Sequence, residues 1–150
     1  MPIQEIATCL EQKKILLTKV MNLTKQIQVR SRQEEIDLED FLEQRVPYME
    51  RAKKCDDLIS HMIQQFAPEE QERIVKILKG EIPEEECAEE ELAVLRLSAE
   101  CKKTFERIVF FNDSAYKAIH QQYESTRIRL NQLRKDEKRP SMFSDYQGSK

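Results

Sequence analysis

The sequence predicts an all-α protein: an elongated antiparallel helical bundle or coiled-coil hairpin with one very long C-terminal helix. Charged residues make up 35% of the 150 residues, and only two residues are glycine, which is typical of long solvated helices. Apolar residues recur at steps of three, four and seven, the spacing that aligns one face of a helix. Residues 84–135 contain neither proline nor glycine, so no helix breaker interrupts that stretch.

The first helix is expected over about residues 3–31. Its apolar stripe continues from Ile3 to Ile27, and Leu16 and Leu23 widen it on one side. A stripe of this width favours packing in a bundle over a narrow two-stranded coiled coil.

A second helix is expected from Asp37 to about Phe66. The carboxylate of Asp37 is a suitable N-cap for it. Pro47 lies inside this stretch and has no amide hydrogen for the helical ladder, so we expect a bend near Glu43 rather than a full break.

Two further helices complete the predicted domain, which covers residues 1–135. A short helix over about 68–79 begins with Pro68 and ends before Gly80. The last helix lies within about 84–135, and about 45 residues at ~1.5 Å each reach ~70 Å, against ~40 Å for the first. Its end is therefore expected to overhang the bundle, and residues 136–150 are expected to form a flexible tail.

The composition argues against several classes of function. A formal net charge of −3 does not suit a nucleic-acid-binding surface, which must be basic. No apolar run approaches the ~20 residues of a membrane span, so we expect no membrane insertion. The four cysteines lie far apart in the sequence, as expected of reduced thiols in a cytoplasmic protein.

No constellation in the sequence indicates catalysis. A di-iron site in a helical bundle needs Glu-x-x-His pairs, but Leu58 precedes His61 by three residues and Lys117 precedes His120. Two histidines offer few general bases for a cysteine nucleophile. We therefore expect no enzyme activity, no metal and no cofactor.

Three polar features of the sequence have a structural explanation and a functional one. Seven glutamates fall within residues 81–91, and a solvated face is the favoured explanation over a docking site. The basic residues near 127–139 complement the negative end of a helix, which is again the favoured explanation. Asn112 continues an apolar stripe, so it either fixes the register of a helical seam or lies near a bend or in water.

Several segments together resemble the FlgN-type flagellar export chaperones of bacteria. They are Leu16–Leu23 in the first helix, Ile36–Arg45 at the start of the second, the asparagine-containing segment Val109–Ile119 in the last, and Tyr146–Gly148 in the tail. The order of these parts covers nearly the whole chain.

The resemblance implies a non-catalytic cytoplasmic chaperone. Such a protein would bind hook-filament junction subunits before secretion and deliver them to the type III export apparatus. Cargo would dock on the last helix, as an amphipathic segment docks in a groove. The resemblance and the stripe geometry together give these candidates for cargo contact: Phe110, Phe111, Ala115, Ile119, Tyr123 and Leu130.

Two alternatives stay open on the sequence. A FliT-type chaperone of the filament cap has a similar short helical chain. A self-associating coiled-coil scaffold or adaptor would use the last helix, with Asn112 in the seam, to form a homo-oligomer.

Overall fold

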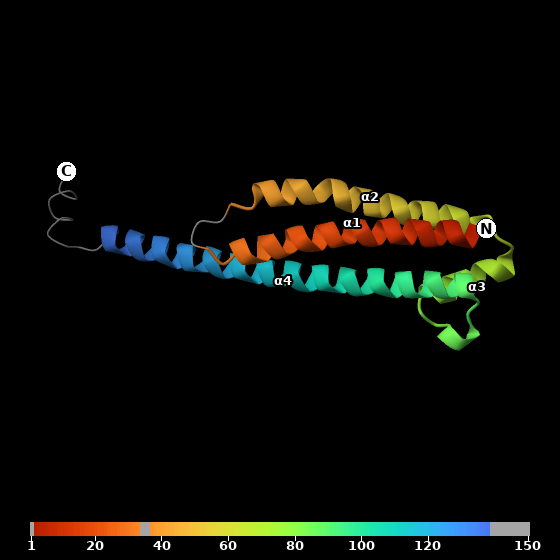
Figure 1. Ribbon diagram of the computed structural model, residues 1–150. Coiled ribbons are helices and arrows are strands. Elements are labelled where there is room, and N and C mark those ends of the chain that lie inside the picture. Colours follow the sequence, from red (N-terminus) through yellow and green to blue (C-terminus); the bar gives the residue numbers. More distant parts are fainter. Residues whose placement is uncertain (1, 34–36, 139–150) are drawn as a thin grey trace.

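The computed structural model describes residues 2–33 and 37–138 and confirms the all-α fold. Its elements are α1 (Pro2–Arg30), α2 (Glu39–Gln64), α3 (Pro68–Leu78), a single 3-10 turn η1 (Glu84–Glu86) and α4 (Glu89–Lys138). Figure 1 shows α1, α2 and α4 lying lengthwise beside one another, with α3 and η1 at one end. The predicted elongated antiparallel bundle with a very long last helix is therefore correct.

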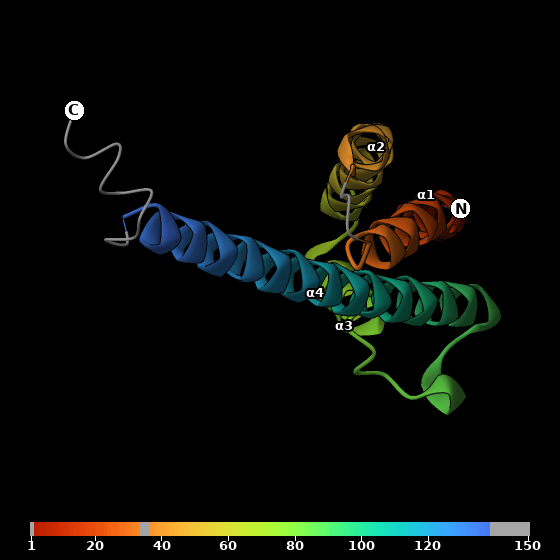
Figure 2. The ribbon, with the colours of Figure 1, turned by 90° about the vertical axis from the view of Figure 1, so that its left-hand side faces the viewer.

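Helix α1 is the centre of the bundle. It packs against α2 on one side and against α4 on another, and Figure 2 shows the three helices in a view turned by 90°. Apolar residues occupy both of these faces of α1, which explains why its stripe is wider than a two-stranded seam.

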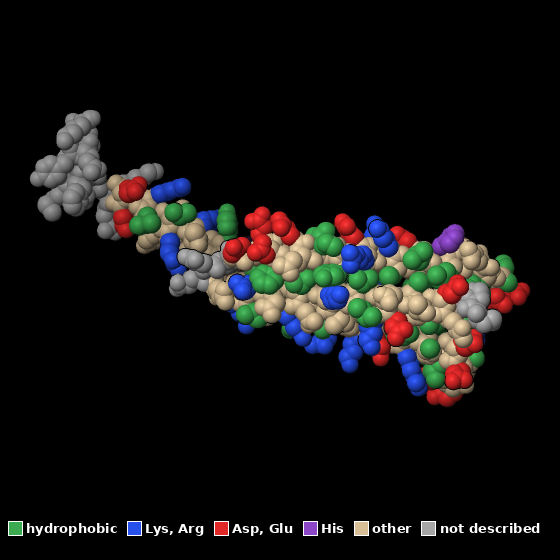
Figure 3. Space-filling model, turned by 45° about the horizontal axis from the view of Figure 1, so that its top comes forward, with side chains coloured by type: hydrophobic (Ala, Val, Ile, Leu, Met, Phe, Trp, Pro, Cys, Tyr) green, Lys and Arg blue, Asp and Glu red, His purple; other side chains and the backbone are tan. Residues whose placement is uncertain are grey.

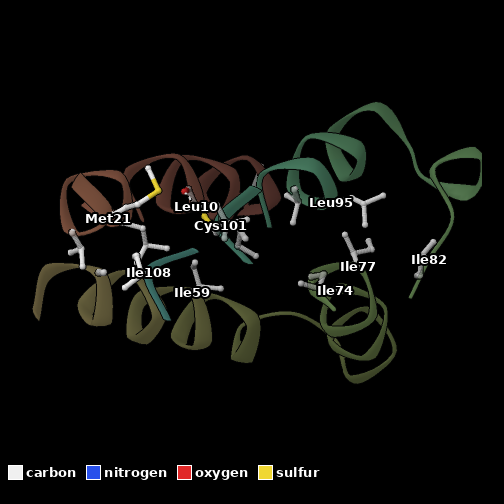
Figure 4. Packing of buried hydrophobic residues seen from close by; sticks show 14 residues of the cluster. Leu10, Met21, Ile59, Ile74, Ile77, Ile82, Leu95, Cys101 and Ile108 are labelled. Atoms are coloured by element: carbon white, nitrogen blue, oxygen red, sulfur yellow. Dashed lines mark hydrogen bonds between the residues drawn. The ribbon is translucent and has the colours of Figure 1, made fainter. Parts of the chain in front are cut away.

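The apolar core has two parts. The main cluster fills the end of the bundle near α3, and all four α-helices contribute to it (Figure 4). Ile6, Ile77 and Val94 are its most completely buried members. A smaller cluster near the other end combines Ile27 of α1 with Ala115 of α4 and residues around the start of α2.

Helix α2 begins slightly later than predicted. Leu38, and not Asp37, occupies the N-cap position, and no side chain caps the helix. Leu38 is buried in the smaller cluster, so packing fixes this start instead of a capping bond. Pro47 lies inside α2, and the helix continues through it without a break, as expected.

Helix α3 ends as the sequence predicts. Gly80 has a positive φ of 75°. Its amide donates to the carbonyl of Ile77, and the amide of Glu81 donates to the carbonyl of Lys76. These two bonds form a Schellman motif, which requires the left-handed conformation that glycine adopts most easily.

The start of α4 differs from the prediction, because the helix begins at Glu89 rather than near Glu84. Residues 84–86 instead form the turn η1, and Cys87 is extended after it. The carboxylate of Glu91 accepts a hydrogen bond from the amide of Ala88 at 2.9 Å. This bond, in which the glutamate of the first turn accepts from the N-cap amide, is one half of a capping box and stabilises a helix start at this later position.

Helix α4 extends well beyond the rest of the bundle (Figure 1). Its 50 residues span ~75 Å, while the 29 residues of α1 span ~44 Å. We call residues 123–138 the projecting end. The helix continues through residues 136–138, the first residues of the predicted tail. The rest of that tail, residues 139–150, lies outside the described part of the chain.

Candidate protein-binding site

The projecting end of α4 exposes an apolar stripe. Tyr123, Leu130 and Leu133 are 65%, 49% and 59% exposed. At 100° per residue they lie on the same face of α4 as Ile108 and Ala115, which are buried in the bundle. The stripe that forms the core therefore continues past the end of α1, where no described helix covers it.

The exposure of this segment is continuous. Every residue from Ser125 to Glu137 is exposed. Figure 3 shows hydrophobic and basic side chains together on this end of the molecule, with acidic side chains toward its tip. Arg127, Arg129 and Arg134 border the apolar stripe, and Arg127 is paired with Glu124 at 2.9 Å. The projecting end thus offers an apolar face with predominantly basic borders.

Gln122 marks the boundary between the bundle and the projecting end. Its side-chain amide donates to the carbonyl of Ser31 at 3.0 Å and to the carbonyl of Gln33 at 2.9 Å. Both carbonyls belong to the turn that ends α1, where backbone acceptors lack partners within the helix. Gln122 therefore ties the end of α1 to α4.

The six predicted contact residues are divided between surface and interior. Phe110, Tyr123 and Leu130 are exposed, and Phe111 and Ile119 are half-buried against the two core clusters. Ala115 is only 2% exposed, so in this arrangement it supports the core and is not available to a partner.

Phe111 has a structural explanation of its own. Its ring lies beneath the ammonium of Lys25 at 5.4 Å and the guanidinium of Arg107 at 6.0 Å. It also packs edge to face on Phe110, with centroids 5.6 Å apart. The contact with Lys25 joins α1 to α4, whereas the contacts with Arg107 and Phe110 lie within α4 and hold the ring in place.

Asn112 belongs to a polar layer at the edge of the bundle, where its own side chain is exposed. Arg45 Nη1 of α2 donates to Asn112 Oδ1 at 3.0 Å and to Thr24 Oγ1 at 3.2 Å. Thr24 is fully buried in α1 and donates to the carbonyl of Val20. The layer lies between the two apolar clusters, and Arg45 links α2 through it to both α1 and α4. Asn112 thus has a partner within its own chain.

The acidic run is mostly solvated, but one glutamate has a specific role. Arg73 of α3 forms a two-pronged pair with Glu91, with distances of 2.7 and 3.0 Å, and also donates to the carbonyl of Glu86. The hydrogen bonds from Arg73 lower the pKa of the Glu91 carboxyl. This pair connects α3 to the first turn of α4.

The cysteines are poorly suited to nucleophilic chemistry. Burial raises the pKa of the thiols of Cys9, Cys55, Cys87 and Cys101, which disfavours the reactive thiolate. Within residues 2–33 and 37–138, no three metal-ligating side chains lie together. No described helix combines the length and the apolar character that crossing a membrane requires.

The contacts of Arg45 and Gln122 are hard to predict from the sequence. A charged residue such as Arg45 in an apolar stripe indicates a buried polar contact, but the stripe does not identify its partners. Gln122 is one of several glutamines in α4, and its role depends on where α1 ends.

No protein-family model, curated protein or solved structure matches this chain.

Proposed function

We propose that this protein is a non-catalytic cytoplasmic chaperone that binds an apolar segment of another protein on the projecting end of α4. One observation carries this proposal: the core-forming stripe of α4 continues through Tyr123, Leu130 and Leu133 beyond the end of α1. A contiguous apolar stripe on an exposed helix is typical of a protein-interaction site.

The geometry favours an amphipathic helix as the bound segment. Within the bundle, α1 covers this face of α4 around Ile108 and Ala115. A helix from a partner would continue that packing where α1 stops. Burial of an apolar side chain of this size contributes roughly 1.5–3 kcal/mol. A micromolar Kd requires a binding free energy of about 8 kcal/mol, and these three residues would supply a substantial part of it.

The resemblance to FlgN-type export chaperones supplies the class of partner. Hook-filament junction subunits are the expected cargo, and the export apparatus is a second expected partner. Binding to this stripe would cover apolar surface of the cargo subunits, through which they would otherwise assemble with one another.

The test is a binding measurement with two matched variants of the full chain. Leu130→Asp introduces a charge into the stripe, and Ile128→Asp introduces the same charge on the opposite face of the same turn. Both residues are exposed, so neither substitution should change the fold, which circular dichroism would verify. Affinity for purified hook-filament junction subunits would be measured by titration calorimetry.

The proposal expects Leu130→Asp to weaken cargo binding at least about tenfold and Ile128→Asp to leave it unchanged. Equal affinity of both variants and wild type would exclude the stripe as the cargo site. Absence of binding to the junction subunits, with binding to the filament-cap subunit, would favour the FliT-type alternative.

Self-association of α4 is the remaining alternative. Asn112 already has a partner in Arg45 of the same chain, so no second copy is needed to explain it. Two projecting ends packed together would also bring arginine borders against each other, which is unfavourable. Sedimentation at several concentrations distinguishes the alternatives, because a scaffold forms a dimer that Leu130→Asp disrupts.

A further inference from the structure

A second apolar surface lies between α2 and α4, away from the projecting end. It is a groove of about 790 Å³ whose floor is formed by α1. Met49 of α2 and Phe105 of α4 stand on opposite walls, and they are 48% and 55% exposed. The apolar floor and walls include Leu10, Leu17, Val20, Met49, Ala52, Phe105 and Ile108.

Both ends of the groove are defined. At one end, Leu78 and Glu81 from the end of α3 and its following turn close it. One turn beyond Met49 and Ile108 at the other end, Arg45 of α2 reaches Asn112 of α4. Ser98 and Ile108 line the groove on α4 and are ten residues apart, so its length is ~15 Å, the length of about three helical turns.

The walls of the groove are unpaired helix faces. Val46, one turn before Met49, and Val109, one turn after Phe105, are also exposed. Each wall therefore presents apolar residues at helical spacing toward the space that a further helix of a bundle would fill.

The charges around the groove favour an acidic occupant. Lys53, Lys79 and Lys102 line it, and among the described residues none of the three has an ion-pair partner. Lys13 is paired with Asp56 at 2.7 Å, which leaves Glu81 as the remaining acid. The groove is thus basic at its rim.

Arg45 strengthens this charge pattern. It is half-buried, its two described hydrogen-bond acceptors are neutral, and its buried Nε has no partner in the part of the chain that the structure describes. Burial lowers the pKa of its guanidinium. A carboxylate brought to this end of the groove would be attracted by the guanidinium charge, which no described acid neutralises.

We propose that this groove binds one amphipathic helix of about three turns from a partner protein, with acidic residues flanking its apolar stripe. A second copy of the chain is a poor occupant, because its own unpaired stripe, on the projecting end, has arginine borders that the lysine rim repels. The groove and the projecting end are separate surfaces, so this proposal does not depend on the proposed function.

The experiment uses the full chain and two stapled, fluorescein-labelled helical peptides of about 14 residues. Both peptides carry the same leucine stripe, flanked by glutamates in one and by lysines in the other. Fluorescence anisotropy measures binding. We expect the glutamate peptide to bind at least about tenfold more tightly than the lysine peptide, with a preference that weakens as salt is added.

Neighbouring lysines provide a matched control for the charges. The double variant Lys53→Glu/Lys102→Glu should weaken binding of the glutamate peptide by about tenfold, since two attractive contacts become repulsive. The variant Lys54→Glu/Lys103→Glu makes the same change in net charge on residues outside the groove and should bind like wild type.

An exposed leucine outside the groove provides the control for the apolar contact. Phe105→Ala should weaken binding of the glutamate peptide by about tenfold. Leu58→Ala, at an exposed position outside the groove, should leave that binding unchanged. Binding that is absent, or that responds equally to both variants of either pair, would overturn the proposal. A dimer of the free protein that Phe105→Ala dissociates would also overturn it, because a second copy would then be the occupant.

Discussion

Replacement of Gln122 by alanine tests whether the end of α1 is held by α4 as the structure indicates. The side chain supplies two hydrogen bonds, to the carbonyls of Ser31 and Gln33. Ser31 is fully buried, so its carbonyl would lose its partner, whereas Gln33 is exposed and water can replace the bond there. At about 1 kcal/mol for a hydrogen bond and 1–3 kcal/mol for an unsatisfied buried acceptor, we expect a loss of about 2 kcal/mol.

Chemical and thermal unfolding monitored by circular dichroism would measure this loss. For a chain of this size, about 2 kcal/mol corresponds to a decrease in Tm of about 4–8 °C. Gln121→Ala is the matched control, since Gln121 is exposed and adjacent, and it should change stability by less than about 0.5 kcal/mol. Equal stability of the two variants would refute the inference that Gln122 stabilises the end of α1.

Three further substitutions have expected effects on stability. Ile77→Ala removes a fully buried side chain and should cost about 3 kcal/mol in urea unfolding; a cost below about 1 kcal/mol would mean that α3 is not firmly packed. Gly80→Ala meets no neighbouring atom within 4 Å but must adopt a positive φ, so a loss of about 1–2 kcal/mol is expected in the same assay. Arg73 lowers the pKa of the Glu91 carboxyl from its ordinary value of 4.5. The Arg73–Glu91 ion pair therefore stabilises the fold above pH 4.5, and this stabilisation is lost as the pH falls through the lowered pKa of Glu91. Urea unfolding across this acidic range should therefore show a smaller pH dependence for Glu91→Gln than for wild type, and identical profiles would exclude the pair as its source.

The helices were predictable because local signals and packing agree. Pro68 and Gly80 bound α3, and the lack of breakers after residue 84 predicts one long helix. The predicted start of α2 at Asp37 is two residues too early, and the predicted start of α4 near Glu84 is five residues too early. At Leu38, burial outweighed the capping preference of Asp37. Before Glu89, the capping bond of Glu91 to Ala88 set the start.

The candidate site was predictable only in part. A helical stripe indicates which residues share a face, so spacing alone places Tyr123 and Leu130 on the apolar face of α4. The stripe does not indicate how far α1 reaches along it, which is why buried Ala115 and exposed Leu130 looked alike. The α2–α4 groove depends on how three helices are placed around α1, and no local pattern contains that information.

The central position of α1 has a consequence for synthesis of the chain. Contacts between α1 and α4 join residues 86–91 positions apart, as with Leu10 and Cys101 or Ser31 and Gln122. At about 5–20 residues per second, α1 waits roughly 4–18 seconds for these partners to be made. During that interval α2 can cover one side of α1, while the apolar side that faces α4 stays open to other chains. Conditions that slow translation between residues 64 and 101 should therefore increase aggregation of the nascent protein.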